Sequence, residues 1–117
     1  MKLILPKPPT TNHIYGYTSR KGFASSYITK EGKQFFIDAQ IAIKKQNNLP
    51  IITVPCEVWV NVFTSTRRDV DGSIKPVLDV LQKAAVIEND YLFYALHATR
   101  EKCKKGEDRV EVEILGY

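Results

Sequence analysis

The chain has 117 residues, of which 44 % are apolar, and it carries 17 Lys and Arg against 13 Asp and Glu, for a net charge of +4. This length predicts one domain spanning residues 1–117, and the apolar content excludes a disordered chain. No apolar run approaches the length of a membrane span, and the stretch before Pro6 is too short for a signal peptide. We therefore expect a cytoplasmic protein.

The charge distribution favours a polyanionic partner. Because several acids cluster in one stretch, the remaining surface is more basic than the net charge suggests, and basic surfaces attract polyanions such as nucleic acids. Ordinary solubilising charge is the alternative. The two cysteines, Cys56 and Cys103, show no metal-ligand spacing, since the sequence has no CxxC or paired CxxH. We expect both to be free thiols.

The N-terminal part predicts a strand followed by an irregular segment. Residues 2–5 predict a short strand that ends at Pro6, and residues 6–27 predict a long loop or arm, because they are rich in Pro, Thr, Ser, Gly, Asn and Tyr. Arg20 and Lys21 lie in this loop among aromatic residues, a mixture that suits contacts to a phosphate backbone and stacking on bases. In the alternative, the loop is held against the core by its aromatic residues, Tyr15, Tyr17, Phe23 and Tyr27.

The middle of the chain predicts a helix followed by a central strand. Thr29 is a suitable N-cap, and apolar residues at helical spacing follow it, so a helix is expected over residues 30–47. Residues 56–66 alternate with a period of two, which predicts a strand. Both of its faces carry apolar side chains, so we expect a central strand in which Trp59 packs in the core rather than stacking on a base.

The last third predicts a helix and two strands. Residues 73–85 predict the helix, and Pro76 is tolerated only in a first turn, so the helix is expected to begin close to Ser73. Residues 94–101 and 109–114 predict the strands, and residues 104–108 predict a hairpin turn that joins them. The resulting order is β-α-β-α-β-β, an α+β fold in which helices pack against a mixed sheet.

The most informative stretch is RRDVDGSIK, residues 67–75, where the strand pattern gives way to the helix pattern. It places Asp69 and Asp71 two residues apart, and carboxylates this close repel each other unless a cation lies between them. A hard divalent ion such as Mg²⁺ prefers oxygen ligands, and the neighbouring Arg67 and Arg68 suit phosphate oxygens. An acidic metal cluster in a basic chain predicts metal-assisted chemistry on nucleic-acid phosphates.

Further residues extend this candidate site. Asp71, Lys75 and Asp79 share a helix face if the helix starts early. Asp90 follows in a loop that is expected to fold back over that helix, so that Asp69, Asp71 and Asp90 converge on one or two metal ions. Lys75 would then stabilise the phosphate. In the alternative, Asp71 caps the helix and Asp69 pairs with an arginine, while Lys75 and Asp79 form a surface ion pair.

Two other motifs are similar to this stretch and do not fit. The DVDGS segment is similar to the DxDG(T/S) nucleophile motif of haloacid-dehalogenase-type phosphatases, which need a long parallel sheet and further acidic motifs downstream. Too little chain follows Asp71 for these features. An EF-hand is excluded because the downstream bidentate Glu and the loop glycine spacing are missing.

Over nearly its whole length the chain resembles the RusA-type Holliday-junction resolvases. That family carries the signature R-D-x-D-N-xx-K-xxx-D-x-L-xxx-G-[VI]-xx-D-D. In the same register this sequence has Arg68, Asp69, Asp71, Gly72, Lys75, Asp79, Leu81, Ala85, Val86, Asn89 and Asp90. The proline-rich PKPPTTNHIY segment and the Lys-Glu-Gly-Lys helix start are also similar to the family.

The resemblance implies a Mg²⁺-dependent endodeoxyribonuclease that resolves four-way (Holliday) junctions by paired symmetric nicks in DNA recombination and repair, with Mn²⁺ able to substitute. It implies that Asp69, Asp71 and Asp90 are catalytic and bind the metal. Lys75 matches the family's catalytic lysine, and Asp79 matches a supporting acid. The family implies a homodimer encoded by a bacterium, phage or prophage. A dimer also follows from the task, since two symmetric nicks need two sites related by a two-fold axis.

The expected DNA contacts are basic residues beside the site and in two loops. They are Arg20, Lys21, Arg67, Arg68, Lys75, Lys102, Lys104 and Lys105. We expect contacts mainly to the backbone and to the shape of the junction, so binding should weaken steeply with salt.

Three positions depart from the signature. Gly72 stands in place of Asn, Ala85 in place of the turn glycine, and Asn89 in place of an acid. Gly72 and Asn89 motivate a second hypothesis, a non-catalytic junction-binding or DNA-binding protein with a decayed metal site. A small metal-dependent phosphatase is a third hypothesis, which the chain length disfavours.

Overall fold

The fold is described for residues 1–9, 15–20, 23–67 and 71–116 in the computed structural model. In chain order the elements are β1 (Lys2–Leu5), β2 (Tyr15–Arg20), β3 (Phe23–Ile28), α2 (Lys30–Gln46), β4 (Cys56–Thr64), α3 (Asp71–Lys83), the 3₁₀ helix η1 (Asp90–Leu92), β5 (Phe93–Lys102) and β6 (Arg109–Gly116). No helix within these ranges is long and apolar enough to cross a membrane.

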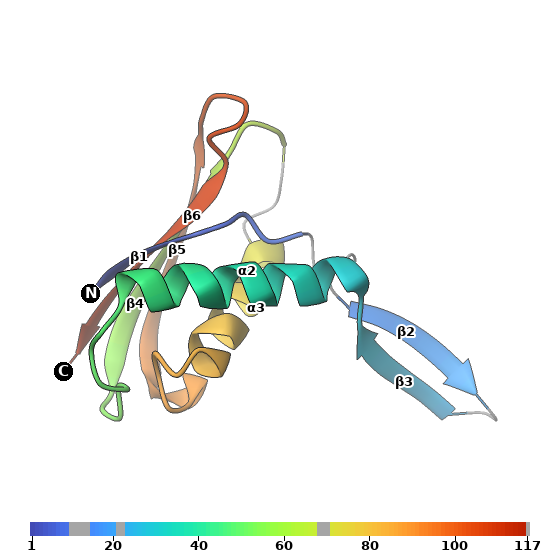
Figure 1. The fold of residues 1–117 in the computed structure, drawn as a ribbon, viewed down its shortest axis with the longest axis horizontal. Helices are drawn as coiled ribbons and strands as arrows, with labels where there is room; N and C mark the ends of the chain where they lie inside the picture. Colours follow the sequence, from blue (N-terminus) through green and yellow to red (C-terminus); the bar gives the residue numbers. More distant parts are fainter. Residues whose placement is uncertain (10–14, 21–22, 68–70, 117) are drawn as a thin grey trace.

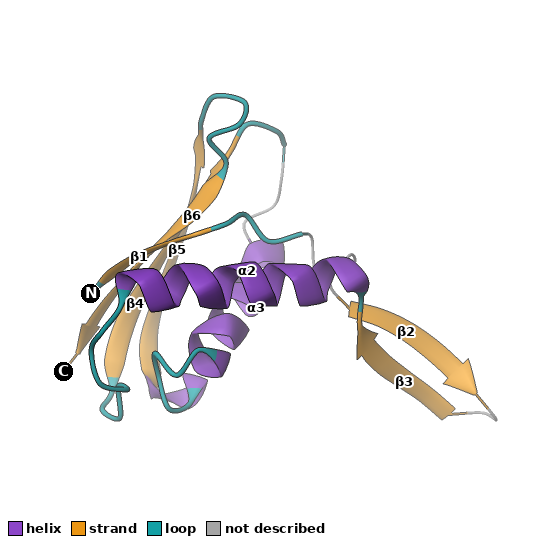
Figure 2. Cartoon of the chain, in the orientation of Figure 1, coloured by secondary structure: helices purple, strands orange, loops and turns teal. Residues whose placement is uncertain are grey.

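A mixed four-stranded sheet with the order β1-β6-β4-β5 organises the fold (Figure 1). Strand β4 pairs with β5 in parallel and with β6 antiparallel, and β1 pairs antiparallel with β6. Figure 2 shows α2 and α3 on the same side of this sheet. The predicted α+β class with a mixed sheet is therefore confirmed, as is the central position of β4.

The two faces of the sheet differ. Along β4, Val58, Val60 and Val62 are fully buried beneath the helices, whereas the alternate residues on the opposite face are partly exposed. Trp59 lies on that second face, where its ring stacks on His97 with centroids 4.8 Å apart and planes 13° apart. The prediction that Trp59 packs in the core is wrong, because the helices cover one face of the sheet and Trp59 points to the other.

Residues 6–27 were predicted to form a loop, and the structure corrects this. Strands β2 and β3 pair antiparallel over their whole length, from Tyr15 opposite Ile28 to Arg20 opposite Phe23. Their hairpin extends beyond the first turn of α2, away from the four-stranded sheet (Figure 1). Tyr27 is exposed, while Ile28 packs against the core where the hairpin meets α2. The element order thus gains a hairpin and a 3₁₀ helix over the predicted β-α-β-α-β-β.

The connection between β5 and β6 is the second correction. A turn with a Glu107 N–H to Lys104 carbonyl hydrogen bond of 3.0 Å does reverse the chain, and Gly106 adopts the positive φ of 88° that this turn needs. The two strands are not a hairpin, however, because β4 lies between them. Helix α3 carries the chain across the sheet so that β5 joins β4 in parallel on one side, which leaves the other side to β6.

Helix α3 begins at Asp71, two residues before the predicted start at Ser73. Pro76 therefore lies in the second turn, where it removes only the backbone hydrogen bond to the carbonyl of Gly72. Burial of Val77, Val80 and Leu81 against the sheet offsets this loss. The early start matters for function, because it was the condition for Asp71 and the two following polar residues to share a face.

The β1 edge of the sheet is closed by a side chain. Gln46 at the end of α2 donates from Nε2 to the carbonyl of Ile4 at 2.7 Å, and its Oε1 accepts from the Ile4 N–H at 2.8 Å. The amide of Gln46 thus forms hydrogen bonds with both the N–H and the carbonyl of Ile4, which point away from β6. The opposite edge, β5, has no strand beside it among the described residues.

Candidate active site and nucleic-acid interface

The RRDVDGSIK motif links the end of β4 to the start of α3. Arg67 is exposed and follows β4, and Asp71 is the first residue of α3. Arg68 and Asp69, for which DNA contact and metal binding were predicted, lie outside the described residues. For Asp71 the structure gives the position of the backbone, at the N-terminal end of α3. This end of the helix carries a partial positive charge that favours anions.

One face of α3 carries the predicted polar residues. Because the helix starts at Asp71, residues Asp71, Lys75 and Asp79 follow one another at intervals of four and fall on one side. Lys75 is exposed and Asp79 is half-buried. The opposite side, with Ser73, is packed against the core. The arrangement along the helix is therefore the one that the sequence predicted.

Asp90 lies at the other end of the same helix. It is the first residue of η1, is exposed, and its N–H donates to Oε1 of Gln82 at 3.4 Å. Asn89 precedes it as the cap, accepting from the Tyr91 N–H at 3.1 Å. Asp79 and Gln82 line a shallow surface hollow together with Lys83. The Asp90 loop thus reaches α3 near its C-terminal end.

Within one chain the structure places Asp71 and Asp90 at opposite ends of α3. From Asp71 to Gln82 the helix rises about 16 Å, at about 1.5 Å per residue. The strand register agrees, because Phe93, just after η1, lies opposite Cys56, the first residue of β4, whereas α3 follows the last residue of β4. The predicted folding of the Asp90 loop over the helix therefore brings it to Gln82, near the C-terminal end of α3, rather than to Asp71.

The donor set fits a hard metal ion. The candidate ligands are aspartates, whose oxygens suit Mg²⁺ and Mn²⁺ better than softer ions. In the part of the chain that the structure describes, no three His, Cys, Asp or Glu side chains gather closely enough to hold a metal. Asp69 is not among these residues. A metal centre at the motif thus needs ligands beyond the described side chains of one chain.

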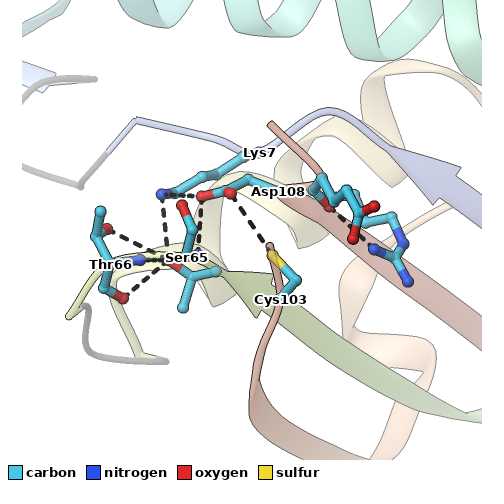
Figure 3. Close-up of polar contacts among 8 residues, drawn as sticks. Lys7, Ser65, Thr66, Cys103 and Asp108 are labelled. Carbon is cyan, nitrogen blue, oxygen red and sulfur yellow. Dashed lines mark hydrogen bonds and ion pairs between the residues drawn. The ribbon is translucent and has the colours of Figure 1, made fainter. Parts of the chain in front are cut away.

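A polar network holds the segment that leads into the motif (Figure 3). The Lys7 ammonium donates to Asp108 Oδ2 at 2.7 Å and to Thr64 Oγ1 at 3.2 Å. The Ser65 N–H donates to the same Asp108 oxygen at 3.2 Å, and the Cys103 thiol donates to Oδ1 at 3.6 Å. The network ties the end of β4 to the segment after β1 and to the β5–β6 turn. We refer to Lys7, Thr64, Ser65, Cys103 and Asp108 as the polar clamp.

The polar clamp shifts the pKa of two of its side chains, Asp108 and Cys103. Hydrogen bonds from Lys7 and Ser65 hold the pKa of Asp108 well below its usual range. Partial burial and the hydrogen bond to Asp108 raise the pKa of the Cys103 thiol, and burial raises that of Cys56. Both thiols are free, as predicted. At neutral pH the clamp therefore contains an ion pair between Lys7 and Asp108, beside a protonated thiol.

The predicted DNA contacts are spread over the molecule. Lys75 is exposed on α3, and Lys104 and Lys105 are exposed in the β5–β6 turn. Arg20 ends β2, and Lys21 lies outside the described residues. Sequence reasoning missed Lys7, Arg100 and Asp108. No motif marks them, because the Lys7–Asp108 contact and the groove that Arg100 shares with Thr64 each join segments distant in the chain.

Comparison with known proteins identifies the class. Residues 6–115 match the family described as Endodeoxyribonuclease RusA. The chain thus falls in a class of enzymes that cut DNA within the strand, and it belongs to the RusA family.

Two curated relatives agree. The chain is 33 % identical over 102 residues to "Crossover junction endodeoxyribonuclease rusA" of Enterobacteria phage HK97, a match that covers 85 % of this chain and 81 % of the phage protein. It is 42 % identical over 51 residues to "Crossover junction endodeoxyribonuclease RusA" of Aquifex aeolicus (strain VF5), a match that covers 44 % of this chain and 40 % of that protein. The second match thus spans less than half of the Aquifex protein.

Proposed function

We propose that this protein is a Mg²⁺-dependent, structure-selective endonuclease that resolves four-way DNA junctions by paired symmetric nicks. Membership of the RusA family and the names of the two relatives support the substrate. The observation that carries the proposal for this chain is the early start of α3, which aligns Asp71, Lys75 and Asp79 on one helix face. An acid suited to a metal and a cation suited to a phosphate thus lie one turn apart on the same face of α3.

In this proposal the residues have separate roles. Asp69, Asp71 and Asp90 hold the ion, which when bound supplies Lewis-acid assistance to phosphodiester hydrolysis. Lys75, one helical turn after Asp71, stabilises the charge that develops on the phosphate. Asp79, a further turn along, orients Lys75 from the same face. The helix N-terminus adds a favourable field for the phosphate anion.

The separation of Asp71 and Asp90 supports a homodimer. Two aspartate side chains around one Mg²⁺ span at most about 12 Å between their Cα atoms, which is less than the rise of α3 between Asp71 and Gln82. We therefore propose that each metal site takes Asp71 from one protomer and Asp90 from its partner. Two-fold symmetry then supplies two such sites, one for each nick.

The experiment compares cleavage of a labelled synthetic four-way junction and of linear duplex of matching sequence in Mg²⁺. The protein should nick the junction at paired symmetric positions and leave the duplex intact. Asp71→Asn should lower the nicking rate by a factor of about 100 or more, with junction binding retained because a charge facing the phosphate has gone. Asp38→Asn, which neutralises an exposed acid on α2, should cut as the wild-type does. Full cutting by Asp71→Asn would refute the site.

A non-catalytic junction-binding protein is the second candidate. The neutral Asn89, where the family has an acid, favours it, since one potential ligand of the site is absent. The structure gives Asn89 a different task, because its side chain caps η1. Tight junction binding without nicks in either Mg²⁺ or Mn²⁺ would support the second candidate.

A further inference from the structure

A basic groove lies where β4 and β5 end. It has a volume of about 430 Å³ and is lined by Thr64, Ser65, Thr66, Arg67, Arg100, Glu101 and Lys102. Three of these side chains are cations and one is a carboxylate. The rest carry hydroxyl groups, which are common donors to phosphate oxygens. Only Arg67 and Lys102 were expected to contact DNA from the sequence.

The strand register directs the two β5 cations to the same side of the sheet as α3. Arg100 lies opposite Val62 and Lys102 opposite Thr64, and both partners are buried on the helix-covered face. Paired residues on neighbouring strands share a face. Glu101, opposite Phe63, belongs to the other face and reaches the groove from there. The cations therefore face the side that carries the motif, and the acid does not.

The floor of the groove is fixed in advance. Thr64 is buried, its hydroxyl donates to the carbonyl of Thr66 at 3.0 Å, and the Thr66 N–H donates back to it at 3.3 Å. The polar clamp holds the same segment from below through Lys7 and Asp108. A wall whose backbone is already fixed loses little entropy when a ligand binds against it. The Thr64–Thr66 side of the groove is thus preformed.

The groove is close enough to the motif to bind the same nucleic-acid strand. Four peptide links connect Arg67 to Asp71, so their Cα atoms are at most about 14 Å apart. Phosphates along one strand of duplex DNA recur about every 3.4 Å of helix axis. A strand with its scissile phosphate at the α3 N-terminus therefore has another phosphate, at most about four nucleotides away, at the level of the groove.

We propose that this groove binds the phosphodiester backbone of the DNA strand being cut, within about four nucleotides of the scissile phosphate, with Lys102 and Arg100 as the main cationic contacts. The proposal rests on the proposed function and adds a positioning site to it. Arg100 supplies a planar fork suited to two phosphate oxygens. Lys102 supplies a point charge, and the Ser65–Thr66 segment supplies hydroxyl donors. Glu101 limits affinity at this position and keeps the contact reversible.

The test is junction affinity across a salt series without divalent ions, measured by anisotropy of a labelled four-way junction. Lys102→Gln and Arg100→Gln should each weaken binding about fivefold and lower the slope of log K against log salt by about 0.9. Glu101→Gln should tighten binding about twofold, because it removes a repulsive charge. Lys45→Gln, which removes an exposed lysine near the end of α2, is the matched control and should leave the affinity and the slope unchanged.

The remaining outcomes separate the groove from the rest of the mechanism. In Lys102→Gln the loss of cleavage should appear as a higher protein concentration at half-maximal nicking, since the groove positions the strand and holds no reacting group. If Lys102→Gln and Arg100→Gln bind the junction like Lys45→Gln, the groove proposal is wrong while the proposed function stands. If the wild-type binds no DNA, both fail.

A competition with inorganic phosphate distinguishes a DNA backbone from a free anion as the ligand. Millimolar phosphate should displace the junction no better than chloride of equal ionic strength, because a single ion gains nothing from the neighbouring contacts. Displacement by phosphate from wild-type, but not from Lys102→Gln, would identify a free-anion site and overturn the proposal.

Discussion

The two ends of helix α3 are held in place by different forces. At the end where Asp71 lies, the chain enters from β4 through a segment fixed by the polar clamp, with an ion pair, hydroxyl groups and a thiol. At the end where Asp90 lies, Val86 and Ile87 are fully buried, and Ile52 exchanges two backbone hydrogen bonds of 2.9 Å with the residues on either side of Ile87.

Because different forces hold the two ends of α3, the two halves of the site respond differently to pH and salt. Apolar burial and buried backbone hydrogen bonds change little with pH or salt. An ion pair with partly exposed partners weakens as salt rises or as its carboxylate is protonated. We therefore expect the Asp71 end to respond to solution conditions under which the Asp90 end does not change.

The largest expected effect tests whether the aspartates of each metal site come from one protomer or from two. Asp71→Asn and Asp90→Asn should each be inactive alone. If Asp71 and Asp90 of one site come from different protomers, a mixed dimer of the two variants has one intact site and one doubly substituted site. Half of the dimers are mixed after subunit exchange, so nicking of the junction should return to about a quarter of the wild-type rate. The measurement is nicking of a labelled junction as a function of mixing ratio.

If both aspartates of a site come from the same protomer, the mixture should stay inactive, since every site in a mixed dimer then carries one substitution. Binding provides an independent readout. Mn²⁺ should shift the monomer–dimer equilibrium of wild-type toward the dimer in sedimentation experiments, and it should not do so for Asp90→Asn. Absence of complementation together with a Mn²⁺-independent dimer would place both aspartates in one protomer.

The second effect is on the apolar end. Ile87→Ala should lower the free energy of unfolding by about 2–5 kcal/mol, because it empties a fully buried position, and the loss should be the same at pH 7 and pH 5. Urea denaturation measures it. Ile41→Ala, at a half-exposed position on α2, should change the stability far less. Junction affinity of the folded Ile87→Ala protein should match wild-type, since the groove lies at the other end of α3.

The third effect is on the polar clamp. Asp108 has a pKa below its unfolded value, so its contribution to stability is complete above the ordinary aspartate pKa of about 4 and is lost only as the pH falls toward the lower folded pKa. Asp108→Asn should therefore lower the melting temperature at pH 7 and at pH 5 alike, with the difference from wild-type shrinking below about pH 4. Unlike Ile87→Ala, it should also weaken junction binding.

Glu107→Gln is the control for this variant, because it removes one exposed negative charge from the same turn. It should leave the melting temperature and the junction affinity near their wild-type values. A deficit in Asp108→Asn that grew as the pH fell from 7 to 4 would contradict the assigned direction of the pKa shift.

The smallest effect concerns Ala85, which stands where the family has glycine. It adopts a φ of 56°, the left-handed conformation that closes the end of α3, with the Val86 N–H bonded to the carbonyl of Leu81 at 3.0 Å. Ala85 thus adopts the turn conformation that glycine would adopt at this position, with added backbone strain from its Cβ. Ala85→Gly should raise the free energy of unfolding by about 0.5–1 kcal/mol, whereas Ala84→Gly should lower it.

The elements with strong periodicity were predictable from the sequence. Residues 56–64 alternate strictly, and Thr29 caps α2 through a hydrogen bond of 3.1 Å from the Gly32 N–H to its Oγ1, as its position indicated. The β2–β3 hairpin was missed because its strands, YGYTSR and FASSYI, are rich in small polar residues that are also typical of loops. Local composition does not show which strand a segment will pair with.

The candidate site likewise has one part that residue spacing predicts and another that it does not. The alignment of Asp71, Lys75 and Asp79 depends only on helix geometry, so residue spacing predicted it. The position of Asp90 depends on the crossover between two parallel strands, which no local pattern encodes. The contact between Lys7 and Asp108 joins residues 101 positions apart. Such long-range polar contacts follow from the completed topology and leave no signal in one sequence.

The amide of Gln46 has a consequence for assembly. A sheet recruits further strands through edge backbone groups that have no partner, and this side chain occupies those of Ile4 at the β1 edge. A strand added at the β1 edge would therefore have to displace this amide from Ile4, whereas β5 has no strand beside it among the described residues. Two copies that join through β5 would each cover the edge that is easier to extend, so growth of the sheet beyond a pair is disfavoured.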